Sequence, residues 1–235
     1  MTAVVARNLE KRFGRTIGLD GIDLDIPAGS TTAILGPNGA GKSTLLRLIA
    51  GLARPSSGSL EVGGQPAHSR AARARVGFIG HATGLYPELT ARENLIFAAR
   101  LRGVADATEK IEAQLKEAGL TRAADRRTGE FSRGMAQRLS IAVGLIDEPE
   151  IVLLDEPFTG LDGTASNRLA ERLMGLRQRN RTLVLVSHDV ALAARLADAA
   201  VVLRRGRIAH RESGDPLDAK ILENAYSAAS NPEVS

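Results

Sequence analysis

Short runs of apolar and β-branched residues alternate along most of the chain with stretches whose apolar residues recur at helical spacing. Largely apolar runs, typical of strands buried on both faces, are TTAILG at 31–36, IVLLD at 151–155 and TLVLVSH at 182–188. The run AAVVLRRGRIAH at 199–210 predicts two more strands around Arg205 and Gly206. This order of strands and helices predicts an α/β fold with a central, mainly parallel sheet covered by helices.

The beginning of the chain follows a different pattern. TAVVARNLEKRF at 2–13 and GLDGIDLDIP at 18–27 alternate apolar and polar residues, as half-exposed antiparallel strands do. We therefore expect a small N-terminal antiparallel β subdomain ahead of the parallel sheet.

Between about residues 85 and 145, recognisable strands give way to helical patterns. Thr90 with Glu93, and Asp106 with Glu109, each have the spacing of a capping box before a helix. We interpret this region as a helical subdomain inserted in the α/β core. We expect residues 1–235 to form one domain, with a frayed tail at ASNPEVS, residues 229–235.

Composition is that of an ordinary soluble protein. The 235 residues suffice for one large domain, and 43% are hydrophobic while 25% are charged. No stretch approaches the roughly 18 continuous apolar residues of a membrane-spanning helix. Charges within MTAVVARNLEKRF interrupt the apolar segment that a signal peptide needs, so we expect a cytoplasmic location.

Several chemistries are disfavoured by what the sequence contains. Cysteine is absent, which excludes disulfides, thiolate metal sites and cysteine nucleophiles. The net charge of +4 is modest, and there is no Trp to stack on the bases of a single strand. We therefore expect no nucleic-acid partner.

The strongest motif is GPNGAGKST at 36–44, which fits G-x-x-x-x-G-K-[ST] and lies between a predicted strand and a predicted helix. In such a P-loop the backbone N–H groups turn inward around phosphates, the lysine adds a positive charge and the serine hydroxyl ligates Mg²⁺. The residues predicted to bind a polyphosphate are Gly36, Pro37, Asn38, Gly39, Ala40, Gly41, Lys42, Ser43 and Thr44.

A second motif is the apolar run that ends in two carboxylates, IVLLDEP at 151–157. Asp155 is predicted to hold the same Mg²⁺ as Ser43, and Glu156 to orient and deprotonate a water that attacks the terminal phosphate. By itself the pattern also fits a strand running into an acidic turn. The two motifs together leave kinases, GTPases, helicases and transport ATPases open.

The segment FSRGMAQR at 131–138 resembles the signature motif of ABC ATPases, usually written LSGGQ. Ser132 and Gly134 match that pattern, whereas Phe131, Arg133 and Met135 depart from it. Considered without the resemblance, Ser132 is a helix N-cap, and a helix N-terminus favours anions. The resemblance implies that this segment closes over the γ-phosphate held by a second subunit, so that hydrolysis requires a dimer.

The same resemblance implies roles for three more residues. TGLD at 159–162 looks like the dimer-interface loop with Asp162 facing the partner, and His188 looks like the switch histidine that contacts the γ-phosphate. Phe13 falls where the family has an aromatic residue that stacks on adenine. The alternatives are that Asp162 caps the next helix, that His188 is structural and that Phe13 is an ordinary strand residue.

The stretch VGFIGHATGLYPELTARENL at 76–95 resembles the loop that joins the sheet to the helical insertion in this family. His81 replaces a glutamine that senses Mg²⁺ and water there, and an imidazole is shorter and titrates near neutrality. In transporters this region receives a helix of the membrane subunit. Leu85 and Tyr86 suit such an apolar contact, or else pack in the local core.

The resemblance covers about residues 3–210 and implies one ABC nucleotide-binding domain, with ATP and Mg²⁺ as ligands. It implies as partners a second nucleotide-binding subunit, expected to form a homodimer, and transmembrane permease subunits that hold the chain at the cytoplasmic face of the cell membrane. Parts of 80–95 and 131–142 also resemble the haem exporter ATPase of cytochrome c maturation, and similar stretches occur in drug and polysaccharide exporters.

Two other functions are weighed against this one. A soluble ABC-type ATPase that acts on nucleic acid or ribosomes is the alternative, but its relatives carry a long coiled coil or two cassettes in one chain, and this sequence has neither. A regulatory cassette that binds ATP without hydrolysing it is disfavoured because Lys42 and Glu156 are both present.

Overall fold

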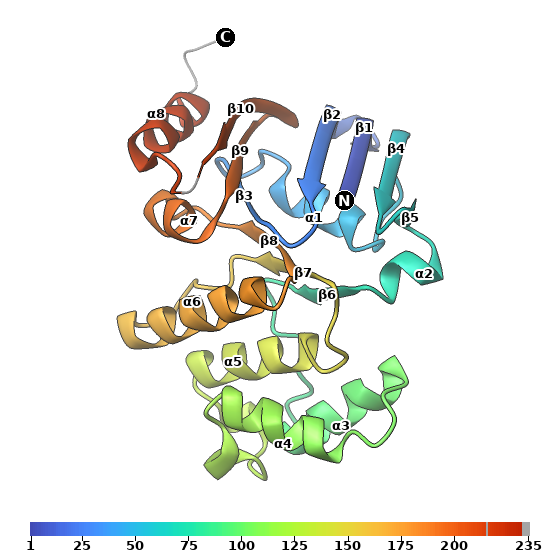
Figure 1. Cartoon of the computed structure of the whole chain (residues 1–235), viewed down its shortest axis with the longest axis vertical. Helices are drawn as coiled ribbons and strands as arrows, with labels where there is room; N and C mark the ends of the chain where they lie inside the picture. The colour runs from blue at the N-terminus through green and yellow to red at the C-terminus, as the bar shows by residue number, and fades with distance from the viewer. Residues whose placement is uncertain (215, 232–235) are drawn as a thin grey trace.

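The computed structural model of the chain describes residues 1–214 and 216–231 (Figure 1). The strands are β1 (Thr2–Phe13), β2 (Thr16–Pro27), β3 (Thr31–Leu35), β4 (Ser57–Val62), β5 (Gln65–Pro66), β6 (Val76–Ile79), β7 (Ile151–Asp155), β8 (Thr182–Val186), β9 (Ala199–Arg204) and β10 (Arg207–Ser213). The helices are α1 (Lys42–Ile49), α2 (Arg70–Arg73), α3 (Ala91–Arg102), α4 (Thr108–Glu117), α5 (Arg133–Gly144), α6 (Gly163–Gln178), α7 (Val190–Leu196) and α8 (Ala219–Ser230), with 3₁₀ turns at Thr121–Ala123 and Thr128–Glu130.

Across the described residues, the strands form a six-stranded sheet in the order β10-β9-β3-β8-β7-β6 and a four-stranded sheet in the order β2-β1-β4-β5. In the larger sheet β9, β3, β8, β7 and β6 are parallel, and β10 is antiparallel at one edge. The smaller sheet is antiparallel throughout. The mainly parallel sheet and the antiparallel N-terminal sheet are therefore both confirmed, although the sequence patterns did not assign β4 and β5.

The five parallel strands of the six-stranded sheet are buried on both faces, which explains why they are almost continuously apolar, whereas the edge strand β10 is partly exposed and largely polar. Ile34 and Leu153 point toward α1 and the four-stranded sheet, whereas Leu35 and Leu154 point to the opposite face. Helices α5 to α8 cover that opposite face, and Figure 1 shows the four-stranded sheet on the other side of α1. Burial on both faces fixes the register of the strands and hence the positions of the loops that follow them.

Helices α3, α4 and α5 lie together at one end of the molecule, in the range predicted to be helical (Figure 1). They share an apolar cluster of their own, to which α5 contributes Leu139 and Ala142. On its other side α5 places Ile141 and Leu145 against the face of the sheet that α6 also covers. Helix α5 thus joins these helices to the sheet.

The predicted helix caps have different outcomes. The Thr90–Glu93 capping box is present at the start of α3. The Asp106–Glu109 box is wrong, because α4 begins at Thr108 after Ala107, and Asp106 has the left-handed φ of 44° instead of the extended conformation of an N-cap.

The C-terminal region contains a helix that the sequence patterns did not identify. Helix α8 packs through Leu222 in the apolar cluster of α7 and β9, and it extends to Ser230. The predicted frayed tail is therefore wrong at residues 229–230, and its residues 232–235 lie outside the described residues. None of the helices in the described part of the chain is long and apolar enough to cross a membrane.

Candidate active site

The loop between β3 and α1 contains the predicted polyphosphate-binding residues. The loop ends at Gly41, which is the N-cap of α1 with a left-handed φ of 107°. A Cβ at this position would lie 2.6 Å from the carbonyl oxygen of Gly18, so only glycine fits this turn. The backbone N–H groups at the start of α1 have no intrahelical acceptor, and this leaves them available for an anion.

Lys42 crosses this loop. Its Nζ donates hydrogen bonds to the carbonyl oxygens of Gly36, at 2.6 Å, and Pro37, at 3.1 Å. Only 8% of the residue is exposed, and burial lowers the pKa of the ammonium group, while Glu156 and Asp155 oppose that shift. The structure thus holds a buried positive charge among backbone dipoles, as a phosphate site requires.

The strand order brings the other candidate residues to the same edge of the sheet. Strand β8 lies between β3 and β7, and all three are parallel, so their carboxyl ends meet. The phosphate loop follows β3, His188 follows β8, and Asp155 with Glu156 ends β7. In open parallel sheets such an edge is where ligands bind.

The predicted Mg²⁺ ligands lie next to one another. The Ser43 hydroxyl donates a hydrogen bond to Oδ1 of Asp155 at 3.2 Å, and Asp155 is otherwise buried. Among the described residues, no three His, Asp or Glu side chains gather into a metal-binding group of their own. One hydroxyl and one carboxylate fit Mg²⁺, which takes few protein oxygens and completes its octahedron with phosphate oxygens and water.

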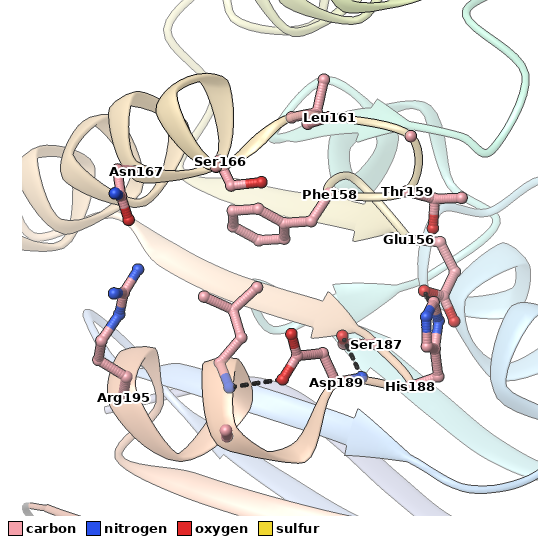
Figure 2. Close-up of a pocket in the computed structure, with 14 residues that line it drawn as sticks. Glu156, Phe158, Thr159, Leu161, Ser166, Asn167, Ser187, His188, Asp189 and Arg195 are labelled. Carbon is pink, nitrogen blue, oxygen red and sulfur yellow. Dashed lines mark hydrogen bonds and ion pairs between the residues drawn. The ribbon is translucent and has the colours of Figure 1, made fainter.

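Glu156 and His188 form a close pair beside this loop. Nδ1 of His188 lies 2.7 Å from Oε2 of Glu156, and Figure 2 shows the two side chains together at one end of a cavity. The backbone of Glu156 has a left-handed φ of 55°, and its N–H donates to the carbonyl of Val186. Because this conformation is uncommon for glutamate and is held from the neighbouring strand, it points to a functional constraint on this side chain.

A cleft of about 430 Å³ unites most of the predicted site. The residues that line it are Phe13, Thr16, Ile17, Gly18, Asn38, Gly39, Ala40, Gly41, Lys42, Ser43, Thr44, His81, Asp155 and Glu156. Phe13 is 54% exposed, and its ring lies against Gly18 at the edge of the cleft. His81, which follows β6, is exposed at the cleft as well.

A second cavity of about 590 Å³ adjoins Glu156 and His188 and runs between α6 and α7 (Figure 2). Thr159, Ser166, Ser187 and Asp189 add polar groups to its wall. The Asp189 side chain accepts from the Leu192 N–H and so caps α7. Glu156 therefore lines both cavities, whereas His188 lines only the second.

Five predicted site residues in the described part of the chain line neither cavity. Gly36 and Pro37 belong to the phosphate loop, where their carbonyl oxygens accept from Lys42. Within the described residues, Ser132, Gly134 and Asp162 are not among those lining either cavity. Ser132 caps α5 by accepting from the Met135 N–H, and Asp162 caps α6 by accepting from the Ala165 N–H. Both capping alternatives are therefore present in the structure.

Sequence reasoning missed the start of β2 as part of the cleft. Thr16, Ile17 and Gly18 face the phosphate loop across the cleft, and Ile17 is an exposed apolar side chain. The signal available was the short turn after Phe13, since a hairpin places the next residues beside that ring.

Comparison with known proteins gives a consistent result. The family model described as ABC transporter matches residues 19–159, more than half of the chain. A Nod factor export ATP-binding protein I of Burkholderia orbicola (strain AU 1054) is 41% identical over 205 residues, which are 86% of this chain and 67% of that protein. The protein of the same name from Cupriavidus metallidurans (strain CH34) is 37% identical over 227 residues, 94% of this chain and 75% of the relative.

Solved structures agree with this. A structure described as the ATP-binding subunit of an ABC transporter superposes with a TM-score of 0.88 at 28% identity, over 97% of this chain and 99% of that one. A dimeric ATP-binding cassette in a post-hydrolysis state, bound to ADP and Pi, superposes with a TM-score of 0.79 at 29% identity, over 89% of this chain and 98% of that one.

Proposed function

Because the chain belongs to the ABC transporter family as an ATP-binding subunit with an ABC ATPase domain, we propose that it powers export through a separate membrane permease. The proposal treats residues 1–235 as one nucleotide-binding domain with a helical subdomain at about 85–145. The observation that supports ATP hydrolysis as the source of that power is the Glu156–His188 pair at 2.7 Å beside the phosphate loop.

The proposed chemistry is phosphoryl transfer to water. In this proposal Phe13 stacks on the adenine and residues 36–44 bind the phosphates. Ser43 and Asp155 would hold Mg²⁺, which would supply positive charge to the phosphate oxygens. The oxygen of a water molecule bonds to the γ-phosphorus while Glu156 takes a proton from that water. The bond between the γ-phosphorus and the oxygen that bridges it to the β-phosphate breaks, and ADP leaves with that oxygen. His188 holds the Glu156 carboxylate and would contact the γ-phosphate. His81, which lines the cleft, would hydrogen-bond to a water there.

We propose that a second copy of the chain completes the site. Ser132, Gly134 and Asp162 lie outside the cleft of their own chain, and Ser132 stands exposed at the N-terminus of α5. In the proposed homodimer the N-terminus of α5 faces the γ-phosphate bound by the partner, where its dipole stabilises negative charge. Asp162 then faces the other copy at the interface.

The permease is proposed to dock on the exposed apolar side of α3. Tyr86 and Phe97 pack edge to face with ring centroids 4.9 Å apart, and both are partly exposed next to Leu101, which is 72% exposed. Three adjacent apolar side chains at a surface suit a helix of a partner. Leu85, the other candidate for this contact, instead lies half-buried against the apolar cluster of α3 to α5, which is the alternative of packing in the local core. Such docking would place the chain peripherally at the cytoplasmic face of the membrane.

In this proposal, the direction of transport and the transported substrate follow from the relatives and from the permease. The relatives' printed names favour export, and they are names of Nod factor exporters, so they do not support the haem exporter predicted from short stretches. We propose export of a substrate selected by the permease and not by this chain. Copurification of the permease and identification of its cargo tests this, and an importer as partner would contradict it.

The central test is Glu156→Gln, which keeps the shape of the side chain and removes the base. We expect ATP binding to persist, an ATP-dependent dimer to accumulate on size exclusion, and turnover to fall by about 10²- to 10³-fold. Glu171→Gln, an exposed position on α6, is the matched control and should retain normal turnover. Undiminished ATPase activity in Glu156→Gln would overturn the assignment of the base.

A further inference from the structure

Arg133 is the first residue of α5, and its side chain lies against a glycine of another loop. A Cβ built on Gly160 would lie 2.5 Å from Nε, 2.7 Å from Cζ and 2.8 Å from Cδ of Arg133. The end of the arginine side chain therefore fills the space beside the Gly160 backbone, and glycine at 160, with a φ of 77°, is what allows this approach.

Gly160 belongs to the loop that follows Glu156. In that loop the Thr159 N–H donates to the carbonyl of Glu156, and the Leu161 N–H donates to the carbonyl of Phe158. Strand β8 fixes the beginning of the loop through the bond from the Glu156 N–H to Val186. The far turn, at Gly160, has the Arg133 side chain as its neighbour from α5.

A second contact supports the same packing. A Cβ at Gly134 would lie 3.8 Å from Cδ2 of Leu161, which is ordinary van der Waals distance. The first turn of α5 thus lies along the loop of residues 156–161 over two consecutive positions. Because α5 is anchored in two apolar clusters, it offers this loop a rigid support.

Neither helix stability nor ion pairing accounts for the arginine. A cation in the first turn of a helix is disfavoured by the helix dipole. In the described parts of the chain, residues 1–214 and 216–231, Arg133 makes no ion pair, and its side chain is exposed apart from the contact with the loop. Packing against Gly160 is the interaction that the structure gives it.

We propose that Arg133 is a positioning residue that supports the loop of residues 156–161 and thereby keeps Glu156 in place for hydrolysis. The inference rests on the proposed role of Glu156. The contact acts within one chain and depends on the bulk of the arginine side chain at Cδ, Nε and Cζ. Loss of that bulk lets the turn at Gly160 shift, and a displacement of the base costs turnover without weakening nucleotide binding.

The test compares three variants of the full chain. Arg133→Met keeps bulk without charge, Arg133→Lys keeps bulk and charge, and Arg133→Ala removes both. Steady-state ATPase assays should show kcat within about twofold of wild type for Met and Lys, and roughly fivefold to tenfold lower for Ala. The KM for ATP should stay within about twofold in all three, and the melting temperature should be unchanged. Arg168→Ala, an exposed arginine on α6, is the control.

Other results would overturn the inference. If Arg133→Met loses as much kcat as Arg133→Ala while Arg133→Lys retains wild-type kcat, then the charge of Arg133 matters and its bulk does not. If Ala retains wild-type kcat while Glu156→Gln is inactive, the loop needs no support and the proposed function still stands. If Glu156→Gln itself retains activity, the proposed function fails first.

A double-mutant cycle with Gly160→Ala tests the contact directly. In wild type the new methyl group collides with Arg133 and adds to the backbone strain at this φ, whereas in Arg133→Ala only the strain remains. We therefore compare the fold-loss of kcat that Gly160→Ala causes in each background. This fold-loss should be at least about threefold larger in the wild-type background than in the Arg133→Ala background. Equal factors in the two backgrounds would overturn the contact's role.

Discussion

The imidazole of His188 lies 2.7 Å from the carboxylate of Glu156, and the two residues come from the ends of the neighbouring strands β7 and β8. Residues 152–155 pair in register with 183–186 on β8, so the separation of the two side chains is set by the sheet. A carboxylate that is held by a hydrogen bond and a fixed backbone is already oriented before water arrives.

We expect His188→Ala to lower kcat about 10²-fold, because the Glu156 carboxylate loses the group that orients it. The KM for ATP should change less, since the phosphate loop is intact. Steady-state ATPase kinetics with a nucleotide-binding assay measures both. His210→Ala is a matched control, because His210 also pairs with a glutamate, Glu212 at 3.2 Å, but on β10. Equal losses in the two variants would argue against a specific role for His188.

Much of this arrangement follows from local sequence. Apolar runs that end in Gly36, Asp155 and His188 predict strands, and parallel pairing then gathers those ends at one edge. Ser132 is identified as a cap by its residue type and position. These features depend on a few neighbouring residues, which is why the pattern of the chain predicts them.

Features that depend on distant residues were not predictable. The contact between Arg133 and Gly160 joins the start of α5 to the loop after β7, and nothing in either segment signals the other. Strand β4 forms by pairing with β1, far away in sequence, and β5 in turn pairs with β4. Asp106 does not cap α4 because its backbone is left-handed. The conformation of the turn before α4 sets this φ, and the residue type of Asp106 does not reveal it.

Lys42 gives a prediction about pH. Its folded-state pKa is lowered by burial, so between that value and the ordinary 10.5 the unfolded chain binds more protons than the folded chain. The free energy of unfolding of the nucleotide-free chain should therefore rise with pH through this window, relative to Lys42→Met. Urea unfolding across alkaline pH measures the difference. Lys116→Met, at an exposed position on α4, is the control for loss of a lysine. The prediction is contradicted if the unfolding free energy of wild type minus that of Lys42→Met stays constant or falls as pH rises.

Arg172 of α6 links the core to α4. Its Nη2 donates to Oε1 of Gln114 at 2.6 Å and to Oε2 of Glu117 at 3.3 Å, and burial lowers the pKa of the guanidinium. Its Nε is buried without a hydrogen-bond partner among the described residues. The guanidinium is thus largely desolvated, and the two acceptors on α4 compensate for part of that cost.

We expect Arg172→Ala to lower the free energy of unfolding by about 1–2 kcal/mol, because packing and two hydrogen bonds are lost. This loss is smaller than that expected on breaking a fully buried salt bridge, because Glu117 is half exposed and remains hydrated when Arg172 is removed. Urea denaturation measures it. Arg168→Ala, exposed on the same helix, should change the unfolding free energy by less than about 0.5 kcal/mol. If the two variants behave alike, the link between α6 and α4 contributes nothing.

Ser132 separates a structural role from a role at a second copy. Its hydroxyl accepts from the Met135 N–H, so Ser132→Ala should lower the free energy of unfolding by about 1 kcal/mol. Ser132→Asp keeps the cap and should unfold at the same urea concentration as wild type. If the N-terminus of α5 faces a partner's γ-phosphate, however, the added negative charge should repel it and prevent ATP-dependent dimerisation in the Glu156→Gln background. Size exclusion with ATP measures this, and dimers of Ser132→Asp as abundant as those with serine would show that no phosphate approaches α5.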